Sequence, residues 1–151
     1  MSIRLAEANR AIQGALAKAR NLAVNISVTV CDADGRLVAF QRMDGTLAEA
    51  HRASYGKALA SATSGRPSGD ESLEASRHFR TATVIGEGVS LMRRPGGLPI
   101  IRAGQVEGAL GVAGATDEQC VECALAAIDA LNSSGWKCSF LPLVVSGERS
   151  A

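Results

Sequence analysis

Aromatic residues and histidines are scarce in this 151-residue chain, which has one Trp, one Tyr, three Phe and two His. Ala and Gly are abundant instead, so we expect a core in which small side chains let helices and sheet pack closely. A chain of this length can bury roughly two thirds of its unfolded surface in one core. We therefore expect residues 1–151 to form a single domain.

The chain also lacks an excess of charge of either sign, because 16 Lys and Arg oppose 15 Asp and Glu. Without a basic excess we expect no binding of nucleic acid. No apolar run is long enough to span a bilayer and no signal-peptide core is present, so we expect a cytoplasmic protein that does not bind membranes. The four Cys are too few for a disulfide framework in a chain of this size and should remain thiols.

The segment from residue 26 to residue 45 is the most informative part of the sequence. Residues 26–31 alternate as in a half-buried strand, DADG at 32–35 supplies a turn, and residues 36–41 form the return strand. In this pattern Cys31 lies on the more polar side, where it is a candidate pocket thiol. The hairpin delivers the chain to the start of a helix, where polar groups can face a ligand.

Two helices are predicted around this hairpin. Apolar residues recur with a helical period over residues 3–21, with Ser2 as the expected N-cap. Thr46 and Glu49 have the spacing of a capping box, which predicts a helix over residues 47–63.

In the second half of the chain we expect a short helix over residues 70–80, followed by a hairpin whose strands are 98–101 and 106–113. A capped helix over 116–131 and an edge strand over 138–145 should follow. The capped helix opens on Thr116-Asp117-Glu118-Gln119, and its predicted apolar stripe contains Val121, Leu125, Ile128 and Leu131. Two hairpins indicate an antiparallel sheet, so the predicted fold class is α+β with helices packed on the sheet.

Cys120 and Cys123 form a CxxC pair inside this last helix. A metal site would need a partner cluster or a nearby histidine, and a thioredoxin-like site would need a βα context that this pair, inside a helix just after a capping box, lacks. We therefore expect no metal site, and we expect Cys123 to point away from the apolar stripe.

Several motifs occur in an order that resembles the GlcG/HbpS family, which includes the C-terminal domain of PduO cobalamin adenosyltransferases. They are VTVCDADGRLVAFQRMDG at 28–45, the pair Lys57-Ala58, GGLPI at 96–100 and VEGALGVAG at 106–114. The resemblance implies a profilin-like or PAS-like domain whose antiparallel sheet has about five strands flanked by helices. It also implies a homo-oligomer and an association with haem, a corrinoid or iron.

Haem binding in that family is tied to histidines near the N-terminal part of the domain. The first predicted helix has none here, and the two histidines are His51 and His78. Because these histidines are missing, the sequence favours a small ligand other than a tetrapyrrole.

His51 is the candidate acid–base residue. On its predicted helix it shares one side with Tyr55, Ala58 and Ala62, a side that we expect to face protein. Histidine transfers protons near neutral pH, and Tyr55 is its candidate partner. Two alternatives stay open: His51 ligates a metal or haem iron, or it is a partly buried histidine bonded to a carbonyl or a neighbouring subunit.

Lys57, Arg42 and Asp44 are candidates for an anion-binding mouth near the hairpin, because a lysine held inward suits a carboxylate or a phosphate. The alternative for Lys57 is an ion pair with Asp44 or Asp32. Gly96 and Gly97 could present backbone amides to the ligand, although glycines at such positions also serve close packing of strand and helix.

The predicted function is small-ligand binding of the GlcG/HbpS type, with haem, a corrinoid or a carboxylated catabolic intermediate as candidate ligands. The alternative is a cofactor-independent isomerase, lyase or hydrolase of a catabolic pathway, in which His51 and Tyr55 move protons. A second alternative is an assembly module, that is, a domain whose function is to form an oligomer.

Overall fold

The computed structural model describes residues 2–69 and 91–133 of the chain. Along the chain these residues form α1 (Leu5–Leu22), β1 (Ser27–Asp32), β2 (Leu37–Arg42), α2 (Ala50–Ser64), β3 (Gly97–Arg102), β4 (Gln105–Ala113) and α3 (Asp117–Asn132). None of the helices in these two ranges is long and apolar enough to cross a membrane.

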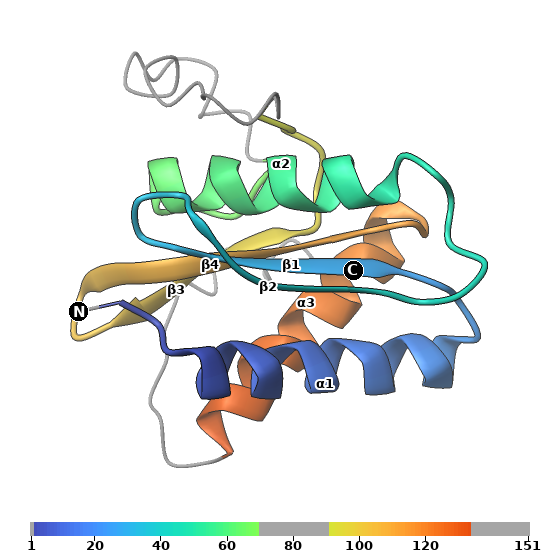
Figure 1. Ribbon diagram of the computed structural model, residues 1–151, viewed down its shortest axis with the longest axis horizontal. Helices are drawn as coiled ribbons and strands as arrows, with labels where there is room; N and C mark the ends of the chain where they lie inside the picture. The colour runs from blue at the N-terminus through green and yellow to red at the C-terminus, as the bar shows by residue number, and fades with distance from the viewer. Residues whose placement is uncertain (1, 70–90, 134–151) are drawn as a thin grey trace, which may run out of the picture.

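The four strands form one antiparallel sheet in the order β2-β1-β4-β3. Helix α2 covers one face of the sheet, and α1 and α3 pack together on the other (Figure 1). The predicted α+β class with an antiparallel sheet is confirmed, with four strands where about five were expected. The helix predicted over 70–80 and the edge strand predicted over 138–145 lie outside the described residues.

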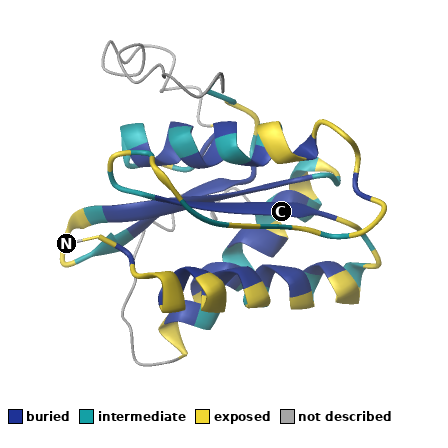
Figure 2. Cartoon of the chain, in the orientation of Figure 1, coloured by how far each residue is buried: buried dark blue, intermediate teal, exposed yellow. Residues whose placement is uncertain are grey.

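Strand β1 is buried on both of its faces (Figure 2). Val28 and Val30 belong to the core beneath α1 and α3. On the opposite face, Thr29 Oγ1 lies 2.7 Å from Ser54 Oγ of α2, so the two hydroxyls satisfy each other. The expectation of a half-buried strand is therefore wrong, because helices cover both sides of the sheet at its centre.

Two of the predicted helix caps differ from the observed ones. Helix α1 begins after Arg4 rather than Ser2, and the Arg4 amide donates to Glu7 Oε1 over 2.9 Å. Helix α2 begins at Ala50 without a side-chain cap, because Thr46 is buried in the preceding loop. There the Thr46 hydroxyl donates to the carbonyl of Met43 over 2.6 Å and so satisfies a loop carbonyl instead of the helix start.

The capping box of α3 is confirmed. Thr116 Oγ1 accepts a hydrogen bond from the Gln119 amide over 3.2 Å, and Gln119 Oε1 accepts one from the Thr116 amide over 3.1 Å. These reciprocal bonds begin the helix immediately after the loop that follows β4.

The buried face of α3 is rotated from the predicted stripe. Val121 and Leu125 are only partly buried, whereas Cys123 is fully buried. A Cβ atom at Gly14 of α1 would lie 2.7 Å from the carbonyl oxygen of Ala126, so the two helices approach too closely for large side chains. The expectation that Cys123 points away from the core is wrong, and burial raises the pKa of its thiol to about 11.

Candidate functional site

A cavity of about 190 Å³ lies beside the end of β4, where the first turns of α2 and α3 begin. Ala50 and Ala53 of α2 form one side of its wall, and the backbone after β4 forms another. Four charged side chains also line it, namely Glu49, Lys57, Arg94 and Asp117. The cavity therefore combines an apolar floor with two cations and two carboxylates.

Lys57 is the most deeply buried of these charged groups, with 5% of the residue exposed. Its Nζ donates a hydrogen bond to the carbonyl oxygen of Val112 over 2.9 Å. Burial lowers the pKa of Lys57, and the opposing influences of Cys120 and Asp117 do not cancel it; the charge of Arg94 adds a smaller effect in the same direction as burial. The positive charge of the lysine therefore has a desolvation free-energy cost, which a bound anion could offset.

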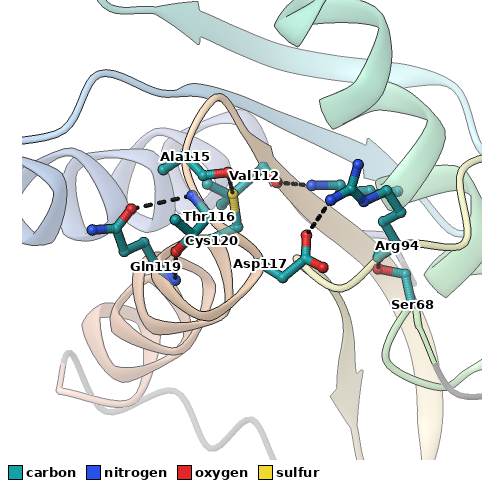
Figure 3. A network of polar contacts seen from close by, with 9 residues as sticks. Ser68, Arg94, Val112, Ala115, Thr116, Asp117, Gln119 and Cys120 are labelled. Carbon is teal, nitrogen blue, oxygen red and sulfur yellow. Dashed lines mark hydrogen bonds and ion pairs between the residues drawn. The ribbon is translucent and has the colours of Figure 1, made fainter.

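Arg94 and Asp117 form an ion pair in the same wall (Figure 3). Arg94 Nη2 donates to Asp117 Oδ1 over 3.2 Å; Arg94 is exposed and Asp117 is partly exposed. An exposed pair of this kind contributes little to stability, so either partner can be drawn toward a ligand.

Ser68 fixes the loop that carries Arg94. Its hydroxyl donates to the carbonyl of Arg94 over 2.7 Å and accepts from the amide of Gly97 over 2.7 Å. Ser68 is itself buried, so these bonds are shielded from water. The loop therefore holds Arg94 at a defined position beside the cavity.

Gly96 and Gly97 lie against Lys57, but neither contributes to the cavity wall. Gly96 has a φ of +130°, and a Cβ atom there would lie 2.6 Å from the carbonyl oxygen of Val112. A Cβ atom at Gly97 would overlap the carbonyl oxygen of Lys57. This geometry agrees with the packing interpretation of the two glycines.

His51 and Tyr55 lie on a different flank of α2 from the cavity. His51 is exposed, with Nδ1 2.9 Å from the carbonyl oxygen of Ala48. The Tyr55 hydroxyl donates to the carbonyl of Gly35 over 2.9 Å, which ties α2 to the turn between β1 and β2. The expectation that His51 faces protein is wrong, because the helix begins at Ala50 and leaves His51 in an open first turn.

Arg42 and Asp44 are not brought together with Lys57. They line a separate hollow of about 380 Å³, which also contacts Leu16 and Asn25. Arg42 Nη2 donates to the carbonyl of Thr46 over 3.3 Å. The prediction that Arg42, Asp44 and Lys57 form one anion-binding mouth is therefore wrong. The predicted ion pair of Lys57 with Asp44 is also wrong, because Lys57 points toward β4 rather than β2.

Cys31 does not form a pocket thiol, because α2 covers it completely. Burial, reinforced by the charge of Asp32, raises the pKa of Cys31 to about 12. Within residues 2–69 and 91–133, no three side chains of His, Cys, Asp or Glu are grouped so that they could hold a metal ion.

Arg94, Asp117 and Ser68 were missed by the sequence reasoning. Arg94 lies two residues before the GGLPI motif at 96–100, and Asp117 belongs to the capping box that begins at Thr116. The signal that could have linked them is topological, because the antiparallel pairing of β3 and β4 brings the loop before β3 beside the residues that follow β4.

Known proteins share this sequence pattern and fold. The family model described as haem degrading protein HbpS-like matches residues 3–129. A comparison with curated protein sequences gave no match.

Three solved structures are similar over most of the chain. The Klebsiella pneumoniae protein ORFY is 26% identical, with a TM-score of 0.72 over 88% of this chain and 93% of that one. A PduOC:heme complex is 23% identical, with a TM-score of 0.74 over 87% and 96%. A double mutant of Streptomyces reticuli HbpS is 22% identical, with a TM-score of 0.75 over 87% and 88%. The last two likenesses establish the fold alone.

Proposed function

The chain belongs to the HbpS-like family, and from that premise we propose that it binds a small carboxylated molecule in the cavity beside Lys57. One observation carries the proposal: Lys57 is 5% exposed, lines a cavity, and has a neutral carbonyl as its hydrogen-bond partner. A buried cation without a matching anion is costly, and a carboxylate entering the cavity would supply the missing charge.

The size of the cavity favours a small ligand. Its volume of about 190 Å³ is below the roughly 300–1,000 Å³ of sites that hold drug-sized molecules. The N-terminal ends of α2 and α3 both border the cavity, and their dipoles favour a negative charge there. A molecule of a few non-hydrogen atoms with one carboxylate suits this space.

The charge of the wall favours a monoanion over a polyanion. Lys57 and Arg94 are balanced by Glu49 and Asp117, so the wall has no net formal charge. A phosphate chain would meet both carboxylates, whereas a single carboxylate can lie between Lys57 and Arg94. The carboxylated catabolic intermediate is therefore the ligand class that these residues favour.

Haem is a second candidate, supported by the description of the family and by the haem complex of the PduO relative. The cavity residues do not fit haem, because the cavity is small and no histidine among the described residues lines it. A haem would have to bind outside it, for which the exposed His51 is the available histidine ligand in the described residues. No contact of these residues favours a corrinoid.

The tetrapyrrole candidate has its own test. A Soret band that forms on addition of haem and is lost in His51→Ala would support it. An unchanged haem spectrum in that variant would remove His51 as the ligand. The acid–base role of His51 and Tyr55, the homo-oligomer and the cytoplasmic location stay predictions.

The carboxylate proposal is tested by calorimetric titration with acetate, lactate and pyruvate. We expect Lys57→Met to weaken binding about tenfold or more, because a charge-assisted hydrogen bond is lost. Lys18→Met is the matched control, because Lys18 is a surface lysine with its Nζ 3.7 Å from Glu122. Equal binding by the wild type and both variants would refute the proposal.

A further inference from the structure

We propose that Lys57 forms an imine with the carbonyl carbon of a small 2-oxo acid held in the cavity. This inference rests on the proposed carboxylate binding and adds a covalent step to it. It narrows the ligand class from carboxylates in general to carboxylates with a neighbouring ketone or aldehyde.

The contacts of Lys57 are those of an amine that is positioned without being neutralised by a carboxylate. Its Nζ is anchored by the carbonyl of Val112, which can accept a hydrogen bond from an ammonium and also, more weakly, from a neutral amine. Asp117, the aspartate in the same wall, pairs with Arg94 instead. Loss of the proton from Lys57 therefore breaks no ion pair among the described contacts.

Gly96 packs against the aliphatic stem of Lys57 and restricts its position. A Cβ atom at Gly96 would lie 3.1 Å from Lys57 Cδ, so the loop is in close contact with the side chain. A nucleophile that is held at one place loses less entropy on reaction than a mobile surface lysine does.

Burial also favours the reactive form of this lysine. It lowers the pKa of Lys57, so a larger share of the amine is neutral at a given pH than for a lysine in water. The neutral amine is the nucleophile in imine formation. Desolvation in a largely apolar site is a known way to activate a lysine in this manner.

Arg94 supplies the complementary half of the site. In a 2-oxo acid the ketone carbon is bonded directly to the carboxylate carbon, so a carboxylate beside Arg94 brings the ketone into the cavity that Lys57 also lines. A planar guanidinium can hold a carboxylate in a fixed orientation. Both cations attract the carboxylate, and in the step that forms the imine Arg94 retains it while Lys57, after loss of its proton, reacts with the ketone.

The chemical step is a condensation that needs no oxidant or reductant. The lone pair of Lys57 Nζ attacks the ketone carbon, the π pair moves to oxygen, and a proton passes from nitrogen to that oxygen to give a carbinolamine. The hydroxyl then takes up a second proton and leaves as water, while the nitrogen lone pair forms the C=N bond. Asp117 and Glu49 are the cavity carboxylates through which these protons can pass.

The test is reductive trapping of the intact protein with pyruvate and sodium borohydride, followed by peptide mapping. We expect the reduced pyruvate adduct at Lys57 and none at Lys18, a comparison within one molecule that needs no variant. Lactate, which has the carboxylate but no ketone, should diminish the adduct by competition. In Lys57→Arg, checked for folding by circular dichroism, the adduct should be lost.

The outcomes separate the two proposals. If lactate and pyruvate both raise the melting temperature but borohydride traps nothing at Lys57, the imine is refuted and carboxylate binding stands. Equal labelling of Lys57 and Lys18 would also refute the imine, because it would indicate unselective surface chemistry. If neither acid raises the melting temperature and no adduct forms, the proposed function is refuted together with the inference.

Discussion

Lys57 of α2 reaches the end of β4, where its Nζ donates a 2.9 Å hydrogen bond to the carbonyl oxygen of Val112. Among the residues that the structure describes, the other buried charged groups are Glu7 and Glu107, and both pair with Arg102. Lys57 is therefore the buried charge that is bonded to a neutral group and also borders a cavity.

The pH dependence of stability should reveal the buried lysine. Because the pKa of Lys57 is lower in the folded protein than its usual 10.5, the unfolded chain binds more protons between the two values, and the unfolding free energy rises with pH there. We expect the wild type to gain stability relative to Lys57→Met as pH rises toward 10.5. Urea denaturation at a series of pH values measures this difference, and a difference that does not change with pH would contradict the prediction.

Cys31 should have the opposite effect. Its thiol titrates near 9.0 when unfolded but at about 12 in the folded protein, so the folded state retains the proton over this interval. The stabilisation is complete below pH 9.0 and is lost as pH rises toward 12. We expect Cys31→Ala to flatten the alkaline decline of the unfolding free energy, whatever its effect at neutral pH. A decline of unchanged slope would show that Cys31 does not cause it.

Removal of the Ser68 hydroxyl should loosen the loop that carries Arg94. Ser68→Ala leaves the Gly97 amide and the Arg94 carbonyl without this partner, at an expected cost of about 1–3 kcal/mol. Chemical denaturation measures the cost, and titration with lactate should show weaker binding. Ser133→Ala is the control, because the exposed hydroxyl of Ser133 donates to the carbonyl of Ala130 at the end of α3 and its removal should change stability by less than about 0.5 kcal/mol.

The close approach of α2 to the sheet depends on Gly111. A Cβ atom there would overlap the carbonyl oxygen of Ser54 and lie 2.7 Å from the Ala58 amide nitrogen. We expect Gly111→Ala to destabilise the protein by about 3 kcal/mol or more, because backbone must move.

Gly104 provides the matched control for this substitution. It has a φ of +78° but open space around it, so Gly104→Ala should cost about 1–2 kcal/mol from backbone strain alone. Similar melting temperatures for the two variants would contradict the tight contact at Gly111.

Much of the fold could be predicted because its signals are local. The turn at 32–35 and the capping box at Thr116 each involve residues a few positions apart, and both are observed. The Thr46 box has the same spacing, yet its hydroxyl bonds the carbonyls of Met43 and Ile26. A spacing rule cannot detect that a loop carbonyl competes for the same donor.

The candidate site was harder to predict because it depends on tertiary contacts. Lys57 was singled out from the sequence, but its position against β4 requires that residue 111, which lies far away in sequence, has no side chain. His51 has helical spacing to Tyr55 and Ala58, but spacing does not say which flank of a helix is covered. Arg94 carries no signal of its own until the pairing of β3 with β4 is known.

The most direct measurement is a crystal structure of the protein grown with saturating lactate. We predict density for one lactate in the cavity, with its carboxylate within hydrogen-bond distance of Lys57 Nζ and Arg94. Lactate bound instead in the hollow lined by Arg42 and Asp44, or a cavity beside Lys57 that holds only water, would contradict the proposed site.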